Sequence, residues 1–152
     1  MYVLFEWKVL YSAIKRREKE IMLFLYMIFG HMIGDYVLQG EFLSRAKCKD
    51  FWYKLYYNKE RDEYYPKYKK YLNDWIAALL CHSFIWSMCI HIPIILFSAY
   101  DSSTLFSSII INFIVHAIID HLKANKEMIN LNQDQLFHII QIFITRIIFF
   151  SA

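Results

Sequence analysis

The chain has few residues that interrupt a helix and few that keep a domain in water. Its 152 residues include three glycines and two prolines, and only 20% are charged whereas 58% are hydrophobic. This composition is too apolar for an ordinary soluble domain, and the length is too short for two domains. Aromatic side chains make up 19%, which suits helices that end at lipid–water boundaries. We therefore expect one all-α integral membrane domain.

Cysteine and clustered positive charge are also scarce. Cys48, Cys81 and Cys89 form no Cys-x-x-Cys pair, and their odd number argues against a complete disulfide framework. We expect free thiols, although the position of Cys81 beside His82 leaves a metal-thiolate role open. The net charge is only +3, and most basic residues are interleaved with acidic ones. A nucleic-acid-binding face needs clustered basic residues, so no nucleic-acid partner is expected.

Four segments are candidate membrane spans, at about residues 21–39, 75–97, 105–122 and 135–150. A bilayer crossing takes about 20 apolar residues, and about 17 is near the lower limit. The last segment therefore needs tilt, bilayer thinning or tight packing to span. We expect a bundle of about four transmembrane helices over residues 21–152, with a polar, aromatic-rich insertion at about residues 41–74.

The first 20 residues are expected to form a separate extension. Residues 1–14 are apolar and aromatic apart from Glu6 and Lys8, and a charge run from Lys15 to Glu20 follows. That run prevents a continuous span, and the order of charges does not fit a signal peptide. An interfacial helix is the expectation. Translation from Met22 is the alternative, because the recognisable pattern begins only after it.

The distribution of basic residues predicts an orientation. Nine of the 17 lysines and arginines lie between residues 41 and 74, and Lys123 and Lys126 lie in the loop on the same side. Only five lie in the N-terminal extension, on the other side. Short loops rich in these residues stay in the cytoplasm, so we expect the insertion to face the cytoplasm. The aromatic insertion is expected to rest on lipid headgroups, with a substrate lid as the alternative.

Three acid–histidine pairs, each spaced four residues apart, carry the main functional signal. Residues four apart lie on the same helix face, and ionisable groups at membrane depth are costly enough to indicate function. In an up-and-down bundle, odd spans end on the side where even spans begin, so the pairs should converge in one layer, joined by a histidine two turns into the second span. These residues are His31/Asp35, His116/Asp120, Asp134/His138 and His82.

Each of these helices also has a polar edge. Asn112 precedes His116 by one turn, and Gln141 and Thr145 continue the face of His138. Such edges avoid lipid and face the interior of a bundle or a watery cavity. Gly30 and Gly34 form a small-xxx-small pattern that would let another helix approach closely.

Histidine and aspartate are common ligands for zinc and for harder divalent ions, and bundle cores build metal sites from inward-pointing residues one turn apart. We expect one or two divalent ions, zinc or manganese/magnesium, held by the seven residues of the layer. The aspartates Asp35, Asp120 and Asp134 are candidate catalytic groups. Candidate substrate-binding residues are Gln39, Lys47, Lys123 and Gln135. A polar or proton-relay network and purely structural packing are the two alternatives.

The polar motifs also resemble a family. In order, they are His31-x3-Asp35-Tyr-x-Leu-Gln39, Lys47, His82, His116-x3-Asp120-x2-Lys123 and Asp134-Gln135-x2-His138. Over about residues 22–148 they resemble a domain-of-unknown-function family of small polytopic membrane proteins of bacteria and phages, with the motifs H-x3-D-F/Y-x-L-Q, H-x3-D-x2-K and D-Q-x2-H. The resemblance implies a helical membrane fold and the importance of these positions, but no particular reaction.

Three functions follow as hypotheses. The first is a membrane-embedded, metal-dependent hydrolase of a phosphorylated or lipid substrate, with Lys47 or Lys123 offsetting substrate charge. The second is a transporter or proton-relay channel, although the titratable groups crowd one side. The third is a non-enzymatic membrane interaction protein with a structural polar core. The chain has no Walker loop and no His-Glu-x-x-His signature that would fix a reaction.

Overall fold

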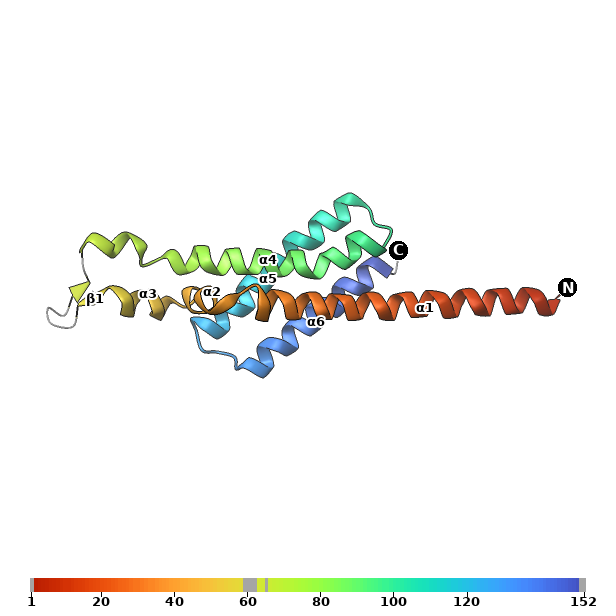
Figure 1. The fold of residues 1–152 in the computed structure, drawn as a ribbon, viewed down its shortest axis with the longest axis horizontal. Coiled ribbons are helices and arrows are strands. Elements are labelled where there is room, and N and C mark those ends of the chain that lie inside the picture. The colour runs from red at the N-terminus through yellow and green to blue at the C-terminus, as the bar shows by residue number, and fades with distance from the viewer. Residues whose placement is uncertain (1, 59–62, 65, 151–152) are drawn as a thin grey trace.

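The computed structural model describes residues 2–58, 63–64 and 66–150, and this part of the chain is almost entirely helical (Figure 1). Four long helices form the body of the molecule, and shorter elements follow the first of them. The elements are α1 (Tyr2–Met32), a π-helical turn η1 (Ile33–Val37), α2 (Gly40–Ala46), α3 (Lys49–Tyr56), the two-residue strands β1 (Tyr57–Asn58) and β2 (Glu63–Tyr64), a 3₁₀ segment η2 (Pro66–Tyr71), α4 (Asp74–Phe97), α5 (Ser102–Ala124) and α6 (Leu131–Phe150).

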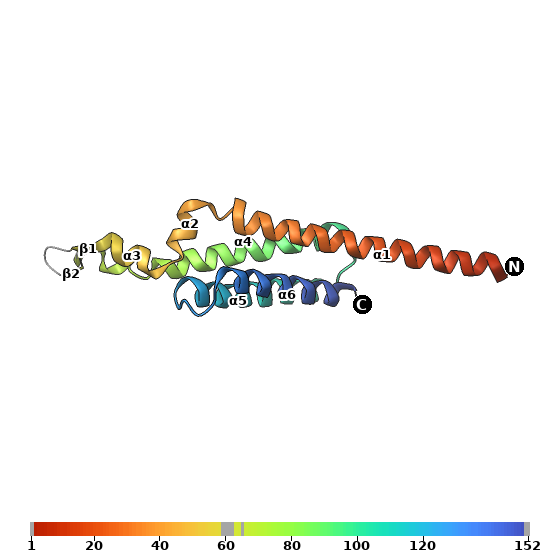
Figure 2. The ribbon, with the colours of Figure 1, turned by 90° about the horizontal axis from the view of Figure 1, so that it is seen from below.

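The long helices pack into one bundle. Helix α4 lies between α1 and α5, and α6 contacts both α1 and α5. Seen from below, α1 and α4 form one layer and α5 and α6 the other (Figure 2). The ends of α1 and α5 therefore lie on the same side as the beginnings of α4 and α6, as the predicted topology requires.

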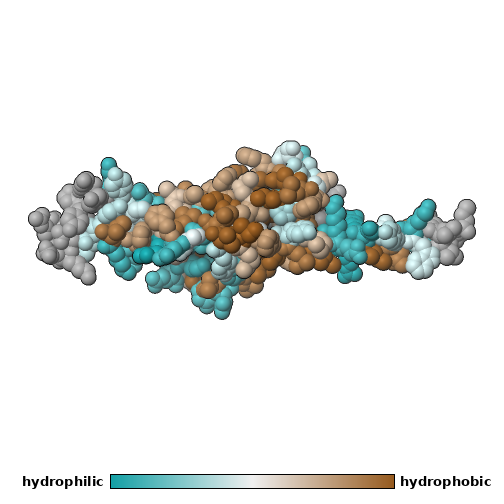
Figure 3. Space-filling view, in the orientation of Figure 1, coloured by the Kyte–Doolittle hydropathy of each residue, from teal (hydrophilic) through white to brown (hydrophobic). Residues whose placement is uncertain are grey.

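Three helical stretches of the described chain are long and apolar enough to cross a membrane. They are Glu6–Val37, Lys69–Phe97 and Ser102–Ala124. The all-helical class is thus confirmed, and three of the predicted spans coincide with helices that could cross a membrane. The fourth span, at about residues 135–150, stays a prediction. Large apolar side chains such as Phe29, Leu96 and Phe106 are more than half exposed, and hydrophobic residues cover most of the central face (Figure 3). Lipid is the medium that suits such a surface.

Helix α1 runs without a break through the charge run from Lys15 to Glu20. Its N-terminal part continues the line of the helix beyond the other helices (Figures 1 and 2). An extension lying in the membrane surface would need a bend in α1, and the helix has none. The interfacial placement of residues 1–20 stays a prediction.

Side-chain caps fix where α5 and α6 begin. Asp101 accepts a hydrogen bond from the backbone N–H of Thr104 at 2.9 Å. Hydrogen bonds from Ser103 and Thr104 hold the pKa of the Asp101 carboxyl below its usual value. Before α6, Asn130 Oδ1 accepts from the Gln133 N–H and Gln133 Oε1 accepts from the Asn130 N–H, each at 3.0 Å. This reciprocal capping box sets the register in which α6 presents its first turn.

Glycine allows α1 to approach α4 closely. A Cβ added at Gly30 would clash with the backbone carbonyl of Cys89, and one added at Gly34 would lie 3.1 Å from Trp86 Cα. The apolar core lies beside this contact and is formed by Leu23, Met27, Trp86, Ile90, Ile94, Ile142 and Phe149. At the first residue of α2, Gly40 has φ 57°, a left-handed conformation that lets the chain turn from η1 into α2.

Replacing Gly30 by alanine should destabilise the bundle more than replacing Gly34. The added methyl group at residue 30 meets a backbone carbonyl that no rotamer change can move, and overpacking of this kind costs about 1–3 kcal/mol. Thermal unfolding of the detergent-purified variants, followed by circular dichroism, would measure the difference. Equal melting temperatures for Gly30→Ala and the wild type would show that the helices do not meet at this distance.

Candidate metal centre

The structure brings the seven histidine and aspartate residues of the predicted layer into one cluster. They come from the end of α1 and η1, the first turns of α4, the last turns of α5 and the first turns of α6. Asp35 lies in the π-helical turn η1. The N–H of Leu38, the residue that caps this turn, donates to the Ile33 carbonyl at 2.8 Å. Turns of this kind occur often at functional sites. The side chain of each of the seven residues is at most 8% exposed.

Asp35, His82 and His116 form the first ligand triad, and their ligand atoms lie within 4.8 Å of one another. His82 Nε2 is 3.2 Å from His116 Nε2 and 3.4 Å from Asp35 Oδ1. His116 Nε2 is 3.8 Å from the same carboxylate oxygen. Two ligands of a tetrahedral zinc ion are separated by about 3.4 Å when each bond is about 2.0–2.1 Å long. The triad therefore has the spacing of a coordination site.

Asp120 joins this triad to the remaining residues. Its Oδ2 lies 3.3 Å from His82 Nε2 and 3.8 Å from His116 Nε2. Its Oδ1 lies 3.7 Å from His138 Nε2, which in turn is 3.4 Å from Asp134 Oδ1. His116, Asp120 and His138 form a second group of ligand atoms within 4.8 Å. The two oxygens of one carboxylate thus face two different sets of ligands.

Several buried atoms of the cluster have no hydrogen-bond partner among the described residues. Such an atom costs about 1–3 kcal/mol when no solvent or ion satisfies it. A bound cation would be a suitable partner for Asp35 Oδ1, Asp134 Oδ1 and His138 Nε2, because each of these atoms lies close to other nitrogen or oxygen ligands of the cluster. The atoms are Asp35 Oδ1, Asp134 Oδ1, His82 Nδ1, His116 Nδ1, and both ring nitrogens of His138.

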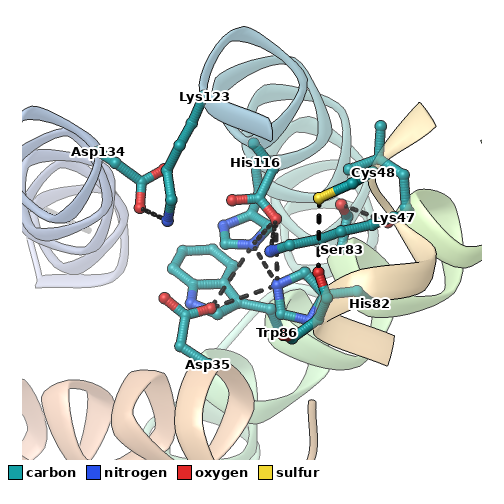
Figure 4. Close-up of polar contacts among 12 residues, drawn as sticks. Asp35, Lys47, Cys48, His82, Ser83, Trp86, His116, Lys123 and Asp134 are labelled. Atoms are coloured by element: carbon teal, nitrogen blue, oxygen red, sulfur yellow. Dashed lines mark hydrogen bonds and ion pairs between the residues drawn. The ribbon is translucent and has the colours of Figure 1, made fainter. Parts of the chain in front are cut away.

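Lysines contact the cluster from two sides. Lys47, which follows α2, donates to Asp120 Oδ2 at 2.5 Å, and Lys123 of α5 donates to Asp134 Oδ2 at 2.5 Å (Figure 4). Lys47 is 6% exposed, whereas the Lys123 side chain is 29% exposed. With its amide oriented to satisfy both neighbours, Gln39 accepts from Lys47 Nζ and donates to the Asp35 carbonyl. With neutral histidines, three carboxylates and two lysines leave a surplus of one negative charge.

His31 is oriented by two neighbours rather than left open. The indole Nε1 of Trp86 donates to His31 Nδ1 at 2.8 Å, so the proton of the ring lies on Nε2, which donates to Gln135 Oε1 at 3.1 Å. Gln135 Nε2 in turn lies 3.3 Å from Asp35 Oδ2 and 3.2 Å from Asp134 Oδ2. Gln135 therefore ties the first turn of α6 to α1 and sits against two of the carboxylates. A ligand role for His31 stays a prediction.

Two residues that the sequence did not single out hold the site in place. Trp86 is fully buried, and its ring stacks on His116 with centroids 4.1 Å apart and also contacts His138 at 5.3 Å. It lies four residues after His82, so the same helix-face argument could have found it. Asn125 accepts from the Lys49 N–H at 2.6 Å and donates to the Lys47 carbonyl at 3.1 Å. No spacing rule marks Asn125, because its role depends on how the insertion folds back.

The polar edges of the helices form a second, deeper layer. His91 bonds the Ser87 carbonyl at 2.7 Å and Ser108 Oγ at 2.8 Å, so both of its ring nitrogens are used. Asn112 donates to Thr145 Oγ1 at 2.9 Å. The Gln141 side chain donates to the Asn112 carbonyl at 2.8 Å. His121 lies outside both layers and stacks on Trp75.

Comparison with known proteins adds no function. No family model, curated protein or solved structure matches the chain. The resemblance to the family of small polytopic membrane proteins therefore stays an expectation from the motifs alone.

Removing the Asn125 side chain should release the segment that carries Lys47, and Cys48 reports on it. Burial raises the pKa of the Cys48 thiol, so the wild type should react slowly with a maleimide. Loss of two hydrogen bonds costs about 1–2 kcal/mol, so Asn125→Ala should speed labelling by about 5–30-fold. Mass spectrometry of protein lacking Cys81 and Cys89 measures the rate.

Asn130→Ala is the matched control for this measurement. It also removes a capping asparagine near the same loop, but the described contacts of Asn130 are to Gln133 and not to the Lys47–Lys49 segment. An unchanged labelling rate in Asn125→Ala would mean that this side chain does not hold the segment.

Proposed function

We propose that the chain is a multi-pass protein of the bacterial inner membrane whose buried cluster binds a divalent metal ion and hydrolyses a phosphorylated or lipid substrate at the cytoplasmic side. The observation that carries the proposal is the spacing of Asp35, His82 and His116, with Asp120 at their edge, at ligand-to-ligand distances of 3.2–3.8 Å. Two unpartnered oxygens favour the same conclusion, because Asp35 Oδ1 and Asp134 Oδ1 have no hydrogen-bond donor among the described residues and a buried polar atom requires a partner.

We infer that α6 is the fourth membrane span. Its strongest obstacle is Arg146, and Arg146 Nη2 pairs with Glu20 Oε2 of α1 at 3.2 Å. An ionisable residue inside a membrane protein is tolerated when it is paired and faces another helix. The contacts of α6 with α1 and α5 also support a place inside the bundle. With four spans, the excess of basic residues in the insertion places the cluster toward the cytoplasm.

The residues around the cluster have distinct roles in this proposal. A divalent ion bound there would supply Lewis acidity and activate water near neutral pH. Asp134 Oδ1 has no hydrogen-bond donor among the described residues, and it would either bind the ion or accept a proton from water. Lys123 is partly exposed beside it and would offset the negative charge of a substrate group. Trp86 would fix the positions of two imidazole rings, because it donates to His31 and stacks on His116. Its apolar ring would also keep water from that side of the site.

A transporter or proton relay is the second candidate, and one observation favours it. The polar edge of α5 continues from Asp120 through His116 and Asn112 to Ser108, which is about 18 Å along the helix at about 1.5 Å per residue. Ser108, Asn112 and His116 are all buried. A path for an ion needs polar groups through the depth of the bundle, and the deeper layer supplies some of them.

Metal content is the first test of the proposed site. The detergent-purified protein should retain divalent metal, and His82→Ala or His116→Ala should lower its metal content by at least half, because a triad that loses one ligand no longer closes around its ion. Elemental analysis measures this directly. His91→Ala is the matched control, since His91 is also buried in α4 but bonds only Ser87 and Ser108. Absence of metal from the wild type would refute the proposal.

Activity separates the two candidate functions. Against a panel of phosphorylated and lipid substrates in mixed micelles, the wild type should release product, and Asp35→Asn should lower the rate by at least a hundredfold because it removes a ligand charge. The transporter reading predicts instead proton flux in reconstituted vesicles that Asn112→Leu abolishes. Absence of product release by the wild type, or flux that depends on Asn112, would move the conclusion away from a hydrolase. Hydrolysis that survives Asp35→Asn would show that Asp35 does not hold the ion that the reaction needs.

A further inference from the structure

We propose that the cluster holds two cations rather than one, with the carboxylate of Asp120 as the bridge between them. The inference rests on the proposed function, because it assumes that the cluster binds divalent metal, and it adds the number of ions and the kind of substrate. The two positions are called the α4 position, at Asp35, His82 and His116, and the α6 position, at Asp134 and His138.

The ligands divide into two sets around Asp120. Oδ2 of Asp120 faces the α4 position, at 3.3 Å from His82 Nε2. Oδ1 faces the α6 position, at 3.7 Å from His138 Nε2. One tetrahedral ion bound by Asp35, His82, His116 and Asp120 Oδ2 has no coordination place left for Asp134 or His138. The ligands of the α6 position are then left over.

Atoms of the α6 position also lack hydrogen-bond partners in the described part of the chain. His138 is fully buried, and neither of its ring nitrogens has a hydrogen-bond partner among the described residues. Asp134 is also fully buried, and its Oδ1 lies 3.4 Å from His138 Nε2 without a donor of its own. A second cation bound at His138 Nε2, which lies 3.7 Å from Asp120 Oδ1 and 3.4 Å from Asp134 Oδ1, would give His138 Nε2 and Asp134 Oδ1 a partner. The stacking of His138 on His116, with centroids 4.2 Å apart, holds the two histidines side by side.

The lysines leave room for the second ion. Lys123 binds Asp134 Oδ2 and leaves Oδ1 open, and Lys47 binds Asp120 Oδ2 and leaves its Oδ1 open. Both oxygens that face the α6 position are therefore free of ammonium groups. No movement of either lysine is needed to admit a cation there.

The charge of a two-ion site indicates the substrate class. The cluster has a formal surplus of one negative charge, so two divalent ions would give it a surplus of three positive charges. A phosphoryl group is the anion that matches such a site, because paired ions about 3.5–4 Å apart stabilise the attacking and leaving oxygens of a phosphoryl group together. The partly exposed Lys123 lies beside the α6 position, where that group would enter. We therefore assign a phosphoryl ester as the substrate.

Manganese stoichiometry tests the second position. The full-length protein in detergent, stripped and reloaded with Mn²⁺, should bind two ions per chain with an exchange-coupled electron paramagnetic resonance signal. His138→Ala should retain one ion and show the signal of isolated Mn²⁺. Asp120→Asn should lose the coupling, because it removes the bridge. His121→Ala is the matched control and should keep two coupled ions, since His121 stacks on Trp75 outside the cluster.

The outcomes separate this inference from the proposed function. One ion per chain in the wild type, unchanged by His138→Ala, would overturn the second position and leave the metal centre standing. No bound ion in the wild type would overturn both. If His138→Ala fails to fold, the near-isosteric Asp134→Asn removes a ligand charge from the same position and should also reduce two ions to one. The wild-type count decides the matter even if both variants fail.

Discussion

The structure depends on how three carboxylates are kept inside an apolar bundle. Asp120 and Asp134 each bind a lysine at 2.5 Å, and Asp35 faces His82, His116 and Gln135. An unpaired charge at this depth would cost several kcal/mol, so each helix must bring a compensating group to the same level. The insertion supplies one of these compensating groups, because it folds back so that Lys47 contacts Asp120 of α5. Its first part is thus bound to α5, through Lys47 to Asp120 and through Lys49 to Asn125.

Close packing and the polar cluster depend on each other. Gly30 and Gly34 let α1 lie directly against α4, and Trp86 fills the space opposite Gly34. The same indole orients His31 and stacks on His116, so a change in helix spacing would move a ligand as well as a core residue. The glycine pattern that favoured helix approach in the sequence therefore has a second consequence, which is the position of the imidazoles.

The sequence predicted the helical class and the residues of the cluster because both follow from periodicity. Four-residue spacing places His116 and Asp120 on one face, and the alternation of spans brings their partners to the same end. The sequence could not predict which ring nitrogen of His31 accepts a hydrogen bond, because that depends on the rotamer of Trp86. It also could not find Asn125, whose partners lie in a folded insertion about 76 residues away in sequence. Helix α1 passes through the Lys15–Glu20 run because charged residues with long side chains are good helix formers, so a charge run need not end a helix.

Two histidines of α4 provide an internal comparison of the possible roles of the polar core. His91 has both ring nitrogens bonded to neighbours, as a histidine that serves packing should. His82, in the same helix, has no partner for Nδ1 in the part of the chain that the structure describes, and its Nε2 lies within 3.4 Å of another imidazole and two carboxylates. A structural network would have satisfied these groups with hydroxyls and carbonyls, as the deeper layer does for His91 with Ser108 Oγ and the Ser87 carbonyl. The histidine–aspartate cluster instead brings several nitrogen and oxygen atoms with free lone pairs close together. A cation is the partner that such an arrangement favours.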